Sequence, residues 1–258
     1  MNHSGVVQVK SISMKLIFGL SALVLLNVGV VSGAEFEEGK HYKLVKNSSE
    51  TQVDEPVQTA EEGTDEAVEL DTVEGETSNS EISVVEYFSY GCNHCYRLEL
   101  FIDAWLATKD EDVTFSRVAV PTRDDWVPYA RAYYIAEDLG ILEKVHSLIF
   151  RAIYVNKQPM GQKRLLKRMF TGVAEIESEK FEEVWASDRI PKMVQNAAIE
   201  LRDLGVDASP TIVVAKKYLI TPETAGDLGL IFDVVDFLVE KIKSERKMED
   251  STAANESS

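Results

Sequence analysis

The two cysteines of this 258-residue chain lie where a strand pattern changes into a helix pattern, and this boundary restricts the fold more than any other feature. Residues 82–90 are rich in β-branched and aromatic side chains, which predicts a buried strand that ends at Gly91. The motif Cys92-Asn93-His94-Cys95 follows directly. Apolar residues then recur at helical spacing, which predicts that Cys92 lies at the N-terminus of an amphipathic helix. These residues are Leu98, Phe101, Ile102 and Trp105.

The position of Cys92 favours redox chemistry. At a helix N-terminus its sulfur faces free backbone N–H groups and the positive end of the helix dipole, which stabilise a thiolate. A thiolate of low pKa is a good leaving group and stabilises the reduced protein. We expect Cys95, one turn further along, to be more buried and to act as the resolving thiol. His94 is expected to add a hydrogen bond or a positive charge.

Zinc binding is the alternative role of such a pair, with His94, His41 or His146 as further ligands. A closed structural zinc site needs four ligands, usually from two paired clusters, and the sequence has no second cluster. We therefore expect no metal and no cofactor. We interpret His146, on the apolar face of a predicted helix, as a packed or surface residue, and His41 as an exposed polar residue.

The N-terminus has the pattern of a secretory signal peptide. Lys10 and Lys15 precede an apolar run, residues 16–31, and small residues lead to a predicted cleavage after Ala34. A membrane anchor is the alternative, but the run is short for a span. Export would place the cysteines where disulfides persist. With only two cysteines in the chain, the pair is interpreted as chemical rather than structural.

The rest of the chain divides by composition. We expect an extended N-terminal arm at the domain edge, an acidic disordered linker or docking segment for a basic partner, a helical insertion and a polar disordered tail. The net charge of −17 argues against nucleic acid and anionic membranes as partners. The predicted ranges are 35–46 for the arm, 47–81 for the linker, 123–188 for the insertion and 245–258 for the tail.

Taken together, these segments resemble the DsbA family of periplasmic disulfide-donating proteins. The stretches that carry the resemblance are 36–42, 85–96, 182–211 and 217–218. The resemblance implies an α/β thioredoxin-like fold, residues 82–122 and 189–244, with an inserted all-helical subdomain. It also implies a cis-proline loop at Ser209-Pro210, lying against the cysteines and able to pair with an extended substrate.

Glu86 shares a face of the predicted strand with Val84 and Phe88, where an ionised carboxylate is costly without a partner. It is either exposed at a sheet edge or, as the resemblance implies, a buried acid that exchanges a proton with Cys95. Two departures from the family pattern stand out. Asn93 replaces the proline of well-known members, which affects the redox potential, and the lysine partner of the acid is replaced by Arg117, whose register relative to Glu86 the sequence leaves open.

The function implied by the resemblance is oxidation of exported proteins with free thiols, in the periplasm, by a monomer that a membrane quinone-linked partner reoxidises. Two alternatives remain. A disulfide isomerase or reductase would use the same cysteines, although the known dimeric isomerases carry an N-terminal association domain. A chaperone-like binding module for unfolded exported chains would work without Cys92.

Overall fold

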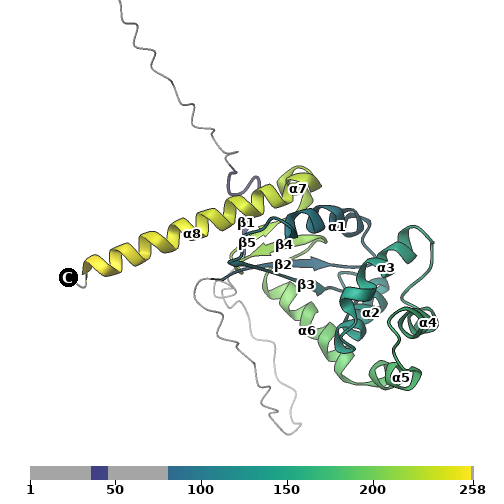
Figure 1. Ribbon diagram of the computed structural model, residues 1–258. Helices are drawn as coiled ribbons and strands as arrows, with labels where there is room; N and C mark the ends of the chain where they lie inside the picture. The colour runs from purple at the N-terminus through teal and green to yellow at the C-terminus, as the bar shows by residue number, and fades with distance from the viewer. Residues whose placement is uncertain (1–35, 46–80, 257–258) are drawn as a thin grey trace, which may run out of the picture. The chain divides into compact units, whose positions relative to one another are not determined.

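The computed structural model describes residues 36–45 and 81–256 (Figure 1). These residues fall in one compact unit. The predicted signal peptide, residues 1–34, and all of the predicted linker except Glu81 lie outside them. Among the described residues no helix combines the length and the apolarity that a membrane crossing needs.

A five-stranded sheet forms the centre of this unit, in the order β1-β5-β4-β2-β3. The interior strand β2 is rich in Val, Tyr and Phe because it is covered on both faces, and it pairs in parallel with β3 and antiparallel with β4. The N-terminal arm contributes β1, which pairs with β5 at the sheet edge. The strands are β1 (Lys43–Leu44), β2 (Ile82–Phe88), β3 (Val113–Ala119), β4 (Thr211–Val214) and β5 (Tyr218–Ile220).

Helices cover both faces of the sheet (Figure 1). On one face α1 (Asn93–Leu106) and α8 (Ile231–Glu256) bury their apolar sides in a cluster that includes Leu98, Leu238 and Val84. On the other face α6 (Arg189–Asp203) packs Val194 against a second cluster. The active-site helix α1 is therefore held by the sheet and by α8.

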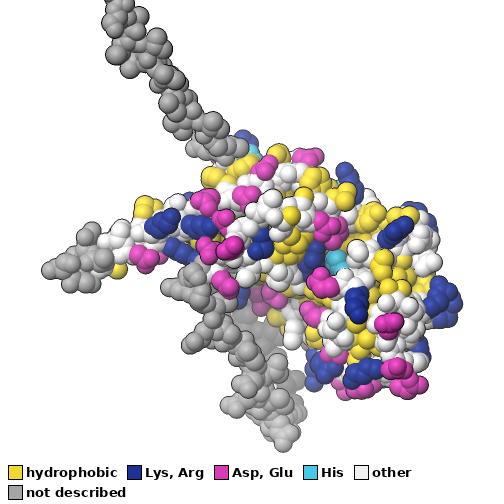
Figure 2. All heavy atoms as spheres, in the orientation of Figure 1, with side chains coloured by type: hydrophobic (Ala, Val, Ile, Leu, Met, Phe, Trp, Pro, Cys, Tyr) yellow, Lys and Arg dark blue, Asp and Glu magenta, His cyan; other side chains and the backbone are white. Residues whose placement is uncertain are grey.

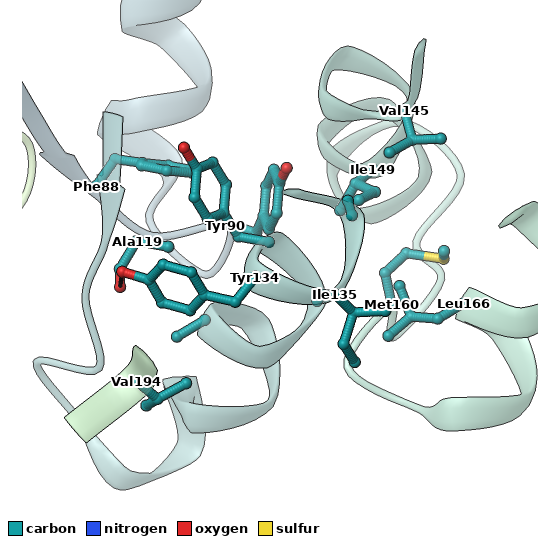
Figure 3. Close-up of a cluster of buried hydrophobic side chains, with 14 of the residues drawn as sticks. Phe88, Tyr90, Ala119, Tyr134, Ile135, Val145, Ile149, Met160, Leu166 and Val194 are labelled. Carbon is teal, nitrogen blue, oxygen red and sulfur yellow. Dashed lines mark hydrogen bonds between the residues drawn. The ribbon is translucent and has the colours of Figure 1, made fainter. Parts of the chain in front are cut away.

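The helical insertion lies between β3 and α6, and its aromatic side chains continue the second cluster (Figure 3). Tyr134 donates a hydrogen bond to the carbonyl of Ala119 at 3.1 Å, which ties the insertion to the end of β3. The insertion consists of η2 (Asp124–Trp126), α2 (Val127–Asp138), α3 (Leu142–Tyr154), α4 (Lys163–Val173) and α5 (Ser178–Ala186).

The C-terminal tail differs from the prediction. The prediction of disorder from residue 245 onward is wrong for residues 245–256, because they continue α8 as helix. Glu245 is bound by Lys241 at 3.1 Å and by Lys217 at 2.9 Å, and the residues that follow include good helix formers without glycine or proline.

The region between β5 and α8 also holds elements that the sequence pattern did not indicate. Thr221 caps a short helix through its side chain. These elements are α7 (Pro222–Ala225) and η3 (Leu228–Leu230).

Acidic and basic side chains are interspersed on the face of the molecule shown in Figure 2. Several form exposed ion pairs, such as that of Glu182 with Lys163 and Lys167 on α4. The basic residues of the insertion are thus partly neutralised within the chain.

Candidate active site

The junction of β2 and α1 places Cys92 as predicted from the sequence. Cys92 is the N-cap residue of α1, and its backbone N–H donates to the carbonyl of Ser89 at 3.0 Å, which closes the turn after β2. Gly91 is required in this turn because a Cβ there would lie 2.5 Å from Nε1 of Trp126. The tight turn and the indole together fix the start of the helix.

Ser209 lies beside both sulfurs, on the loop that joins α6 to β4. Its carbonyl accepts a hydrogen bond from the Cys92 thiol at 3.1 Å, and its hydroxyl lies 3.1 Å from Sγ of Cys95. The bond between Ser209 and Pro210 is cis. Residues that are more than a hundred positions apart in sequence thus meet at the cysteine pair.

The two thiols are both free, and their pKa values are shifted in opposite directions. The thiol of Cys95 donates to the sulfur of Cys92, and this bond, with the backbone N–H groups of Cys95 and His94, lowers the pKa of Cys92 to about 6 despite its burial. The pKa of Cys95 is raised well above its usual value, first by complete burial and then by the bond it gives to Cys92. Near neutral pH the pair is a Cys92 thiolate beside a Cys95 thiol.

The two residues between the cysteines point to the surface. The side chains of Asn93 and His94 are both exposed. His94 acts on the Cys92 thiolate through its backbone N–H.

Glu86 is completely buried on β2, an interior strand between β4 and β3, so the interpretation as an exposed edge residue is wrong. Its partner is Arg117, which stands opposite in the parallel register of β2 and β3. Nε of Arg117 lies 3.1 Å from Oε2 of Glu86, whereas Oε1 of Glu86 has no hydrogen-bond partner. The register left open by the sequence therefore brings the two charges together.

The environment of Glu86 favours its protonated form. Burial, followed by the negative charge of Glu99, raises its pKa to about 8, although Arg117 opposes the shift. The charge of Cys92 raises it further, and the charge of Glu86 in turn raises the pKa of Cys95. Glu86 and the cysteines thus interact electrostatically.

Two further ionisable residues of this region were not identified as site residues from the sequence. Glu99 lies four residues after Cys95 on α1, a spacing that places both on one helix face and that could have indicated it. His146 is packed rather than exposed, and it contacts Glu99. Across residues 36–45 and 81–256, no three His, Cys, Asp or Glu side chains gather as metal ligands would.

Comparison with known proteins identifies the family. The profile of a family described as thioredoxin matches residues 69–233. The chain is 33% identical over 169 residues to the thiol:disulfide interchange protein DsbA of Burkholderia cepacia. This alignment covers 64% of this chain and 77% of that protein. The chain belongs to the DsbA family of thioredoxin-like proteins. It is therefore a thiol-disulfide oxidoreductase.

Solved structures of DsbA proteins share the fold. The crystal structure of Pseudomonas aeruginosa DsbA aligns with a TM-score of 0.64 at 24% identity, over 82% of this chain and 97% of that one. DsbA from Xylella fastidiosa aligns with a TM-score of 0.59 at 28% identity, over 64% of this chain and 88% of that one. The predicted thioredoxin-like α/β class with a helical insertion is thus confirmed.

Proposed function

We propose that this DsbA-family protein donates its Cys92–Cys95 disulfide to exported proteins in the periplasm. The observation that carries the proposal is the opposite acidity of the two thiols, with the pKa of Cys92 at about 6 and that of buried Cys95 well above its usual value. A stable Cys92 thiolate favours the reduced protein, so the oxidised protein gives its disulfide away readily.

The transfer takes two thiol-disulfide exchange steps. A substrate thiolate attacks Sγ of Cys92, the bond between the cysteines breaks, and the sulfur of Cys95 leaves with the electron pair and takes up a proton. A second substrate thiolate then attacks the substrate sulfur of the mixed disulfide, and Cys92 leaves as a thiolate. The substrate loses two electrons and gains a disulfide, while the protein becomes a dithiol.

Glu86 is proposed as the proton donor to Cys95. A thiolate at Cys95 is a poor leaving group because burial disfavours its charge. With its pKa raised to about 8, Glu86 holds a proton near neutral pH and is suited to give it to Cys95. The same carboxylate takes the proton back when Cys95 is reoxidised.

Ser209 and Pro210 are proposed to bind the substrate. The carbonyl of Ser209 lies against Cys92, where an extended chain carrying the attacking thiol would have to pass. The backbone of Ser209 is therefore suited to form hydrogen bonds with the substrate main chain. Its hydroxyl is placed to form a hydrogen bond with the sulfur of Cys95.

The remaining partners follow from the family resemblance. We propose that the protein is a monomer, exported by a signal peptide over residues 1–34, and that a membrane quinone-linked protein reoxidises it. Isomerase or reductase activity would use the same cysteines but would require a more reducing potential.

Trapping in the native host tests this proposal. Cys95→Ala leaves Cys92 to form mixed disulfides that the protein cannot resolve, so we expect adducts with exported proteins on non-reducing gels. Cys92→Ala serves as the matched control and should give none. The redox potential of Cys92 and Cys95, measured against glutathione, is expected to be oxidising. A strongly reducing potential without trapped proteins would contradict disulfide donation, and unchanged activity of Cys92→Ser would instead favour the chaperone-like role.

A further inference from the structure

The buried charges at Glu86 continue through a chain of contacts into the helical insertion. Arg117 reaches two carboxylates, with Nε at 3.1 Å from Oε2 of Glu86 and Nη2 at 3.3 Å from Oε2 of Glu99. The same oxygen of Glu99 lies 3.2 Å from Nε2 of His146 on α3. Residues from β2, β3, α1 and α3 thus meet in one cluster, defined here as Glu86, Arg117, Glu99 and His146.

The orientation of His146 is set by Tyr90, which is fully buried and contacts Phe150 and Phe88. Figure 3 shows Tyr90 beside Phe88. The Tyr90 hydroxyl lies 2.9 Å from Nδ1 of His146. The Glu99 carboxylate beside Nε2 favours the ring proton on that nitrogen, so Nδ1 is the acceptor. The Tyr90 hydroxyl, whose pKa burial raises well above its ordinary value, donates a hydrogen bond to Nδ1. The proton of a neutral His146 ring is then on Nε2, which lies 3.2 Å from Oε2 of Glu99. The geometry of this contact is not that of a hydrogen bond, so the Nε2–H group acts on the carboxylate through its charge distribution.

The charges of the cluster do not cancel. When both carboxyl groups are ionised and His146 is neutral, the cluster has a net charge of −1, so Glu86 and Glu99 compete for Arg117. Other groups face the same region, lining with Glu99, Arg117 and His146 a cavity of about 590 Å³. The titratable and charged ones among them are Asp103, Lys109, Tyr133, Glu137 and Glu143.

We propose that His146, oriented by Tyr90, is a positioning residue that holds the carboxylate of Glu99 and thereby leaves the Nε of Arg117 to Glu86. His146 in this way sets the proton affinity of Glu86 without touching it. The consequence for Cys95 rests on the proton-donor role proposed for Glu86. The reaction centre on the sheet is thus adjusted by a residue of the helical insertion.

The sign of the effect follows from the competition. Without the Nε2–H group, Glu99 would bind Arg117 more closely, the ion pair of Arg117 with Glu86 would weaken, and Glu86 would hold its proton more tightly.

A matched pair of variants tests this positioning role. His146→Phe removes the donor but keeps a ring, whereas the amide of His146→Gln places an N–H near the position of Nε2. We expect the ionisation of Glu86, followed by infrared or carbon-13 NMR signals that Glu86→Gln removes, to occur at higher pH in His146→Phe by about half a pH unit, or threefold in proton affinity. His146→Gln should titrate like the unmodified protein.

Three outcomes can be distinguished when thermal unfolding verifies that both variants are folded. A shift in His146→Phe alone supports the positioning role. Equal titration of Glu86 in all three proteins, or equal shifts in both variants, overturns it. If the shift is present but Glu86→Gln donates disulfides at the normal rate, the positioning of Glu86 stands and its role as proton donor fails.

Discussion

Cys92 owes its acidity to partners that come from its own helix and from its neighbour Cys95. The backbone N–H groups of His94 and Cys95 are free at the first turn of α1, and the Cys95 thiol adds a third donor. The Ser209 carbonyl, which accepts from the Cys92 thiol, can act only while Cys92 is protonated. A hydrogen bond from the Ser209 side chain also lowers the pKa of Cys92, and the thiolate is favoured because these donors together outweigh burial.

We expect the reduced protein to show a thiolate that titrates near pH 6. Absorbance at 240 nm, recorded from pH 3 to 9, should rise in one step whose amplitude corresponds to one thiolate. Cys95 contributes nothing because it stays protonated over this range. Cys92→Ser should abolish the step, and Cys95→Ala should move it to higher pH because the Cys95 donor is lost. A step near pH 9 in the unmodified protein would contradict the described geometry.

Glu86 is a residue whose burial lowers stability. Its pKa is about 8 in the folded chain and 4.5 as an ordinary carboxyl, so the unfolded state gains by ionising as the pH rises above 4.5. Glu86→Gln removes this penalty. We expect the variant to be more stable at pH 7.5 by on the order of 1–3 kcal/mol, and the gain to vanish near pH 4.

Urea unfolding at the two pH values measures this effect. Glu182→Gln is the control, since that exposed ion pair should change stability by no measurable amount. A Glu86→Gln protein less stable than its parent at pH 7.5 would mean that the pair with Arg117 outweighs the burial of charge.

At the scale of elements, α8 contains a buried half and an exposed half. Leu238 and Ile242 are buried against the sheet, whereas residues 247–253 are exposed. The outer part continues as helix because the inner part provides the nucleus that an isolated short helix lacks.

We therefore expect two changes in α8 to have different effects. Removal of residues 247–258 should leave the unfolding midpoint nearly unchanged. Leu238→Ala should lower stability by about 2–5 kcal/mol because it leaves a cavity next to the sheet. Circular dichroism during thermal unfolding compares the two, and a large loss on truncation would show that the outer turns have a packing role.

At the scale of the whole molecule, the acidity of Cys92 links redox state to stability. The pKa of the Cys92 thiol is about 6 in the folded reduced protein, compared with 9.0 for an ordinary thiol. A lowered pKa stabilises the fold above the unfolded value, and this stability is lost as the pH falls from 9 through 6.

The stability of the reduced protein should therefore increase relative to that of the oxidised protein as the pH rises. Between pH 4 and pH 7.5 the difference in unfolding free energy should shift by about 2 kcal/mol in favour of the reduced form. Parallel urea titrations of both forms measure it, and Cys92→Ser, which cannot form the thiolate, supplies the baseline. A difference that does not depend on pH would contradict the link.

The sequence by itself determined the local chemistry of this protein. The run 82–90, Gly91 and the helical spacing after Cys95 were sufficient to place Cys92 at a helix N-terminus, because each signal depends on neighbours along the chain. The family resemblance extended this to the thioredoxin-like fold and to Ser209 and Pro210. The disorder predicted from residue 245 was wrong because composition alone does not show that Glu245 is anchored to Lys217.

Only the tertiary structure decided which distant residues share the site. The pairing of Glu86 with Arg117 depends on the register between β2 and β3, and a slip of one residue would have turned Arg117 to the opposite face. The contact of Glu99 with His146 depends on how α3 packs against α1. Neither arrangement leaves a local signal in the sequence, because one arises from the register between two strands and the other from the packing of the helical insertion against α1.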